Sequence, residues 1–248
     1  MISAKLKVFL RGDVKNIVRD PFMMLVLFVP VLMVLLLQFG IPAIDEHLMS
    51  GFNFQFQDHD SFVVAIFLFM TPIMVGMVTG FLLLDEKDDG IFSYMDITPV
   101  RKTGYLIYRI SIPAILAWGI NILIVIYFFP ENKLLSFLLL IALIVSSAIA
   151  PIMTLYLAAF AKNKVEGMAY SKAVNIFLLA PAATYIFDHP ITMLTYVVPI
   201  TWSAEALYFI HSSESYGYIQ SLPMLVLGGA IVHFIFLYVL YKRIEKII

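Results

Sequence analysis

The sequence predicts an all-helical integral membrane protein with six transmembrane helices, and its composition, span lengths and charge distribution all lead there. Hydrophobic residues make up 62% of the 248 residues and charged residues only 13%, and the mean hydropathy is +0.95. A soluble domain is about 45–50% apolar and about 25% charged. A chain of this size keeps too much surface in water to hide such an apolar excess.

Six stretches are apolar and long enough to cross a hydrocarbon core of about 30 Å, which takes roughly 20 helical residues. Within a single transmembrane domain, residues 1–248, these spans are expected at 22–41, 61–84, 105–129, 134–160, 168–187 and 222–241. Their interiors carry no charge. Arg109 and Lys172 lie close to span ends, where a long side chain can carry its charge to the membrane surface. A β-barrel would instead show short alternating strands.

The lysines and arginines indicate the orientation. In the six-span arrangement all but Lys133 of the 16 basic residues fall on one side of the membrane. The positive-inside rule then places both termini in the cytoplasm, and we expect a multi-pass protein of the plasma (inner) membrane. Residues 1–20 are charged throughout and do not resemble a cleaved signal peptide, so the first span is expected to direct insertion itself.

The segment before the last span is ambiguous. Residues 191–210 are about as long as a span but contain Pro199 and Glu205, and a seventh span would place the basic C-terminus outside. We therefore predict a re-entrant outer segment at residues 189–217, formed by two short helices that break at Pro199. Such backbone survives at membrane depth only when protein or water covers it.

Two cytoplasmic elements are predicted besides the spans. The first is an amphipathic helix over residues 1–20, with apolar positions three and four apart; the residues expected to form its apolar stripe are Leu6, Phe9, Leu10 and Val14. It either lies on anionic lipid headgroups or docks a cytoplasmic partner. The second, residues 85–104, contains four acids, Gly90, a short apolar run and Thr98-Pro99. An exposed apolar helix of this kind is typical of a plug that enters a groove on another protein.

The order of these features resembles the type-2 ATP-binding-cassette permeases, the membrane subunits of many drug, antibiotic, lipid and polysaccharide exporters. The resemblance covers the acidic turn, Gly90, the short hydrophobic helix and Thr98-Pro99 between the second and third spans. It extends to the amphipathic N-terminal helix, the broken outer segment and the basic end YKRIEKII. The doubled acid Asp88-Asp89 departs from the family pattern, which puts the roles of individual acids in doubt.

The resemblance implies a permease subunit that is not itself an enzyme and moves an amphipathic or hydrophobic substrate outward by alternating access. Two copies, a homodimer, would pair around a central pathway, and each would dock a separate ATPase subunit that binds ATP and Mg. Residues 85–99 would be the coupling helix, with the N-terminal helix beside it as an interface helix. The residues implied as ATPase contacts are Glu86, Asp88, Gly90, Ile91, Phe92, Tyr94, Met95, Thr98 and Pro99.

The sequence lacks the motifs of nucleotide binding and of a calcium loop. No G-x-x-x-x-G-K-[ST] occurs, so this chain has no P-loop for ATP, and we expect it to bind no cofactor or metal itself. Its expected partners are the ATPase, a second permease copy and membrane lipids, with no nucleic acid. The acidic turn lacks the ligand spacing of a calcium loop. An intramembrane protease, with His233 beside Ser146 or Ser147, is a remote alternative.

Polar residues in the spans are candidates for a substrate path, because such residues are costly in a membrane. They are Gln38, Asn121, Asn175 and His233. Glu205, on the outer side, either lines the exit or faces water. Gly76 and Gly80 form a small-xxx-small motif that serves packing within one chain or dimerisation. A self-sufficient carrier or channel is the alternative function, although its expected acidic residues inside spans and internal repeats are not evident.

Overall fold

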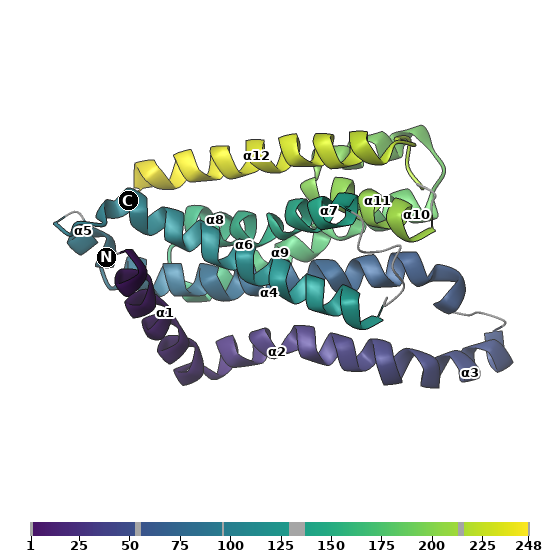
Figure 1. Cartoon of the computed structure of the whole chain (residues 1–248), viewed down its shortest axis with the longest axis horizontal. Helices are drawn as coiled ribbons and strands as arrows, with labels where there is room; N and C mark the ends of the chain where they lie inside the picture. Colours follow the sequence, from purple (N-terminus) through teal and green to yellow (C-terminus); the bar gives the residue numbers. More distant parts are fainter. Residues whose placement is uncertain (1, 53–55, 96, 129–136, 213–215, 248) are drawn as a thin grey trace.

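The computed structural model describes residues 2–52, 56–95, 97–128, 137–212 and 216–247, and within these ranges the chain is helical without strands, which confirms the all-α prediction. The elements in order are α1 (Ile2–Arg19), α2 (Pro21–Leu35), η1 (Leu36–Gly40), α3 (Ile41–Phe52), η2 (Phe56–His59), α4 (Asp60–Asp88), α5 (Ile91–Met95), α6 (Arg101–Phe128), α7 (Phe137–Ser147), α8 (Ile149–Phe160), α9 (Lys164–Phe177), α10 (Leu179–Ile186), η3 (Pro190–Val197), α11 (Pro199–Ser212) and α12 (Leu222–Ile247). The long helices run side by side along one direction, and α1 slants across one end of the bundle (Figure 1).

Five helical stretches in the described part of the chain are long and apolar enough to cross a membrane. They are Pro21–Gly51, Asp60–Asp88, Arg101–Tyr127, Phe137–Phe160 and Leu222–Ile247. These correspond to five of the six predicted spans. The start of the fourth predicted span and Lys133 lie outside the described residues.

The predicted fifth span forms two helices, α9 and α10, which are separated by a turn at Leu178. This pair is not among the five candidate spans. Its first half carries Lys164, Glu166 and Lys172, so it is less apolar than its neighbours. Together α9 and α10 nevertheless lead the chain toward the end of the bundle where α11 lies (Figure 1).

The outer segment breaks where the sequence predicts it. Helix η3 ends at Val197 and α11 begins at Pro199, and the two meet at a bend of 115°. Proline suits the first turn of a helix because it has no N–H to donate there. The pair is apolar enough to count as a sixth, broken span or as a re-entrant loop.

Both termini and α5 lie at one end of the bundle, while α3, α10 and α11 lie toward the other (Figure 1). Helix α4 has 29 residues, about 44 Å at 1.5 Å per residue. It is therefore longer than a hydrocarbon core of about 30 Å, and the charged residues Asp85 to Asp88 are in its last turns at the α5 end.

The centre of the bundle is the contact between α4 and α8. A Cβ on Gly76 would lie 2.4 Å from the carbonyl oxygen of Ala150, and one on Gly80 would lie 2.8 Å from a methyl carbon of Leu157. The glycine motif therefore serves packing within the chain. At the same contact the Thr79 and Thr154 hydroxyls lie 2.6 Å apart, and Thr154 donates to the Gly76 carbonyl.

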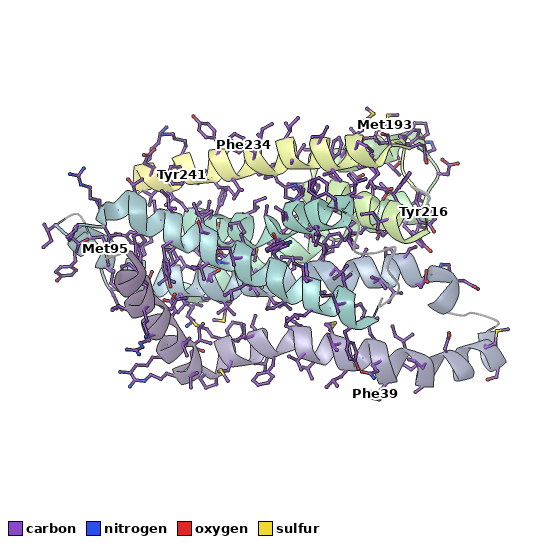
Figure 2. The ribbon with its side chains drawn as sticks, in the orientation of Figure 1. Phe39, Met95, Met193, Tyr216, Phe234 and Tyr241 are labelled. Carbon is purple, nitrogen blue, oxygen red and sulfur yellow. The ribbon has the colours of Figure 1, made fainter. Side chains whose placement is uncertain are left out.

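The outer faces of α2, α6 and α12 carry many exposed apolar side chains. Phe39 and Phe234 point away from the bundle on opposite sides (Figure 2). This distribution suits helices that face lipid tails, because hydrocarbon imposes no cost on an exposed apolar side chain.

Candidate functional site

Helix α5 forms the connection between the ends of α4 and α6. Gly90, with a φ of +69°, ends α4 in the left-handed conformation that favours glycine. On the other side of α5, the Thr98 hydroxyl donates to the Met95 carbonyl at 2.8 Å, and the Arg101 N–H donates to the Thr98 carbonyl. The glycine and threonine of the predicted coupling segment thus fix a short helix between two spans.

The side chains of this segment divide into an inner and an outer set. Phe92 is buried, and its ring lies 5.8 Å from that of Tyr105 in α6. Tyr94 is 65% exposed and Ile97 is 86% exposed. The other residues implied as contacts are exposed (Asp88, Pro99), half-buried (Gly90, Ile91, Met95, Thr98) or buried (Glu86). Glu86 and Phe92 therefore have their contacts within this chain.

A cluster of charged and phenolic side chains lies beneath α5. Arg109 of α6 is only 2% exposed, and its guanidinium forms a bidentate pair with Glu86 of α4. It also donates to Asp13 of α1 at 2.9 Å. Tyr105 accepts from the same guanidinium at 2.8 and 3.1 Å, and Tyr108 donates to Asp13 at 2.5 Å. We call these five residues the Arg109 cluster.

The Arg109 cluster corrects one sequence-based expectation. The sequence suggested that Arg109 extends toward the membrane surface, whereas its guanidinium is buried among two carboxylates and two phenols. Removing one partner of a buried ion pair in general costs about 3–5 kcal/mol, because the other charge is left without compensation. The cluster therefore holds α1, α4 and α6 in one arrangement.

Aromatic packing encloses the Arg109 cluster. The ring of Phe9, in α1, lies 5.3 Å from that of Tyr105 and 5.2 Å from that of Tyr108. Phe92 covers Tyr105 from the side of α5. Helices α1 and α5 thus both pack on the ring of Tyr105.

Helix α1 packs against the bundle through only part of its predicted apolar stripe. Phe9, Leu10 and Ile17 face the bundle with Asp13 between them. Val14 is 60% exposed and does not contact the bundle; the side chain of Leu6 lies outside the described residues. Because Asp13 has a buried partner, it takes the inward position that a purely apolar stripe would give to Val14.

A second ionic contact lies nearby. Asp20 caps the N-terminus of α2 by accepting from the N–H groups of Phe22 and Met23. Lys164 at the start of α9 pairs with Asp20 and, at 3.0 Å, with Asp85. The hydrogen bond from Lys164 lowers the pKa of Asp20. Partial burial opposes the charge on Lys164, yet the bonds to Asp20 and Asp85 raise its pKa.

This contact borders an open groove of about 640 Å³. The lining residues are Asn16, Arg19, Asp20, Pro21, Asp85, Asp88 and Asp89. Within the described ranges, no three histidine or carboxylate side chains are placed to hold a metal ion. The groove is therefore an acidic hollow beside α5, on the same end of the bundle.

The polar residues predicted for a pathway do not converge. Gln38 is exposed and accepts from Tyr127 at 2.7 Å. Asn121 is buried and donates to the Leu68 carbonyl, between α6 and α4. His233 is buried between α12 and α11. The side chain of Asn175 lies outside the described residues.

Glu205 does not face water. It is fully buried and accepts from the backbone N–H of Gly217 at 3.0 Å. A Cβ on Gly217 would lie 2.1 Å from the Tyr196 hydroxyl, so the backbone passes directly over these side chains. In this structure Glu205 anchors the segment that follows α11.

The serines near His233 have ordinary helix contacts. Ser146 and Ser147 each donate to a carbonyl three residues earlier. His233 instead lies 3.4 Å from the Ser203 hydroxyl and 2.7 Å from the Gly229 carbonyl. The predicted partners of a proteolytic site are therefore not brought together.

Asp13, Tyr105, Tyr108 and Arg109 are the members of the cluster that sequence reasoning missed. The available signal was Tyr105-x-x-Tyr108-Arg109 at the start of a span, which places both phenols and the guanidinium within one turn. An arginine several residues inside a span either pairs with a buried acidic group or extends its guanidinium to the membrane surface, and its position in the sequence is compatible with both.

Comparisons with known proteins agree with the membrane architecture. Residues 13–241 match the family described as "Fluoroquinolones export permease protein Rv2686c-like". Two Mycobacterium tuberculosis proteins, the fluoroquinolones export permease proteins MT2760 (strain CDC 1551 / Oshkosh) and Rv2686c (strain ATCC 25618 / H37Rv), are each 25% identical over 96% of this chain and 93% of their own length. No solved structure matches.

Proposed function

Since the chain belongs to the Rv2686c-like family of fluoroquinolone export permeases, we propose that it is the membrane subunit of an ATP-driven exporter and docks a separate ATPase through α5. The chain has no P-loop motif, so the proposed ATP and Mg sites belong to the partner. The end of the bundle that holds α5 is the proposed cytoplasmic end in the plasma membrane.

The exposed side of α5 and the turn after it is the observation that carries this proposal. Tyr94 and Ile97 are both large, both apolar over most of their surface, and largely exposed. They lie on a connection beyond the ends of α4 and α6, where side chains that face lipid have no reason to gather. Aromatic and aliphatic anchors of this kind fill pockets on a partner. The proposed contact surface is therefore Tyr94, Ile97, Pro99 and the two exposed acids of the turn, Asp88 and Asp89.

The proposed substrates are fluoroquinolone-like compounds, which are the substrates named for the two mycobacterial relatives. A second permease copy would complete the pathway, because the candidate polar residues of one chain do not converge on a site. Gln38 is the candidate best placed to line such a path, since its amide is exposed on the outer surface of a span. Closure of two ATPase subunits would shift the spans between inward- and outward-open arrangements.

Co-purification tests the docking proposal. The double variant Tyr94→Asp with Ile97→Asp adds charge to the proposed contact surface without touching Phe92 or the Arg109 cluster. We expect the ATPase to be lost from the purified complex while the permease still inserts in the membrane. Val165→Asp is the matched control, because Val165 is 73% exposed at the start of α9. Retention of the ATPase by the double variant would contradict docking at α5.

Substrate-stimulated hydrolysis tests the transport proposal. The complex in lipid is expected to hydrolyse ATP faster when a fluoroquinolone is added, and to move the drug across the membrane of a vesicle. The secondary-carrier alternative predicts transport without the ATPase subunit. Transport by the permease alone, driven by a proton gradient, would contradict the ATP-driven mechanism.

A further inference from the structure

We propose that Arg109 is a positioning residue that ties the interface helix α1 to the spans α4 and α6, so that the three move as one body when α5 is displaced. This inference depends on the proposed docking of an ATPase at α5. The inference assigns a role to the buried guanidinium of Arg109, which is not part of the proposed contact surface for the ATPase.

The guanidinium of Arg109 reaches three helices at once. Its Nε and Nη2 atoms bind Glu86 near the end of α4, and its Nη1 atom donates to Asp13 in the middle of α1. Its planar fork can serve two carboxylates in fixed directions, which an ammonium group cannot do. The side chain thus fixes the relative angle of the helices as well as their distance.

Helix α1 needs such a tie to transmit movement. It ends at Arg19, and Asp20 and Pro21 begin a new helix in a different direction. Its outward face is exposed at Val8, Val14 and Val18. Asp13 lies seven residues before Asp20, about 10 Å along the helix. The ionic contact therefore holds α1 at a distance from the joint about which it could pivot.

The coupling segment contacts the same cluster directly. Phe92 packs on Tyr105, and the Tyr105 hydroxyl accepts two hydrogen bonds from Arg109. Glu86 lies four residues before Gly90, where α5 is connected to α4. A displacement of α5 therefore reaches Arg109 from two sides. Apolar packing alone tolerates sliding, whereas a satisfied ion cluster has one geometry.

Distance measurements between spin labels test the rigid unit. The chain has no cysteine, so Val14→Cys on α1 and Ile107→Cys on α6 can be labelled without background; both side chains are exposed. We expect a narrow distance distribution in the full-length permease. The distribution should stay the same when the ATPase and a non-hydrolysable ATP analogue are added. Arg109→Gln should broaden it, and Arg11→Gln, an exposed arginine of α1, should not.

Transport per ATP hydrolysed provides the functional readout. We expect Arg109→Gln to lower this ratio about fivefold, with basal hydrolysis within about twofold of the parent complex and the ATPase still bound. Arg109→Lys keeps the charge without the fork and should restore part of the ratio. Tyr108→Phe removes only the hydroxyl bound to Asp13, and it carries the test if Arg109→Gln cannot be purified.

Two results would overturn the inference. One is a change in the α1–α6 distance of the parent protein when the ATPase binds nucleotide. The other is an unchanged distance distribution and transport ratio in Arg109→Gln, or in Tyr108→Phe if Arg109→Gln cannot be purified. If the ATPase fails to bind the parent permease, the proposed function fails, and the spin-label comparison of the permease alone still decides whether Arg109 holds α1.

Discussion

Within the residues that the structure describes, Arg109 is the one lysine or arginine that is buried. The sequence showed an arginine near a span end, and that position is compatible with both a solvated and a buried guanidinium. The difference depends on Asp13 and Glu86, which come from helices that are distant in the sequence. Because ion-pair partners are set by tertiary packing, the cluster could not be predicted from the pattern of α6 alone.

Loss of one carboxylate from the cluster should be costly. We expect Glu86→Ala to lower the free energy of unfolding by about 3–5 kcal/mol, since Arg109 would remain buried with half its charge compensation removed. Asp88→Ala, two residues later and exposed, should change it by less than about 0.5 kcal/mol. Heat-induced unfolding in detergent measures both, and equal midpoints for the two variants would contradict the buried pair.

The glycine at the α4–α8 contact is the second residue with a predictable effect. A Cβ at Gly76 would overlap the Ala150 carbonyl, so Gly76→Ala should destabilise the fold by about 1–3 kcal/mol. Gly12→Ala, where no atom lies within 4 Å of the added carbon, should instead stabilise α1 by about 0.5–1 kcal/mol. Opposite shifts of the unfolding midpoint are expected, and a neutral Gly76→Ala would show that α4 and α8 can separate.

At the scale of the elements, the sequence predicted where helices begin and end better than it predicted which side of a helix packs against the bundle. Gly90, Thr98 and Pro199 mark turns through their own backbone preferences, and the structure has a turn or a helix boundary at each. The apolar spacing of α1 did not indicate which residues face the bundle, because a charged residue, Asp13, takes an inward position. The turn at Leu178 in the fifth predicted span lies three residues before Pro181. Proline inside a helix removes the hydrogen bond to the residue four positions earlier and disrupts the preceding turn, so a local signal for this break was present in the sequence.

The junction of α1, α2 and α9 should depend on pH. The lowered pKa of Asp20 means that its stabilising contribution is full above the usual aspartate pKa and is lost as pH falls through the lowered value. The raised pKa of Lys164 keeps its contribution until the pH rises above the usual lysine pKa of 10.5. Between pH 5 and pH 3 the free energy of unfolding of Lys164→Met should therefore fall less than that of the parent protein, by roughly the 0–1 kcal/mol of such a pair. An acid response identical to that of the parent would contradict the contact.

At the scale of the whole molecule, composition and apolar run length were sufficient for the fold class and for five of the spans. Charge placement predicted that the two termini and the loop between the second and third spans share one side, and the structure brings them to one end of the bundle. The substrate path could not be predicted, because the polar residues of a single chain, such as Asn121 and His233, pack against neighbouring helices of the same chain.

Accessibility of α5 from the two sides of the membrane tests the central claim most directly. A single Tyr94→Cys in this cysteine-free chain can be treated with a membrane-impermeant maleimide, with Met193→Cys at the opposite end as control. For the permease expressed without its ATPase, which would cover position 94, the account predicts that Cys at position 94 reacts only in inside-out vesicles and that Cys at position 193 reacts in intact cells. Labelling of position 94 in intact cells would place α5 on the exterior, where an ATPase supplied with cellular ATP could not bind it.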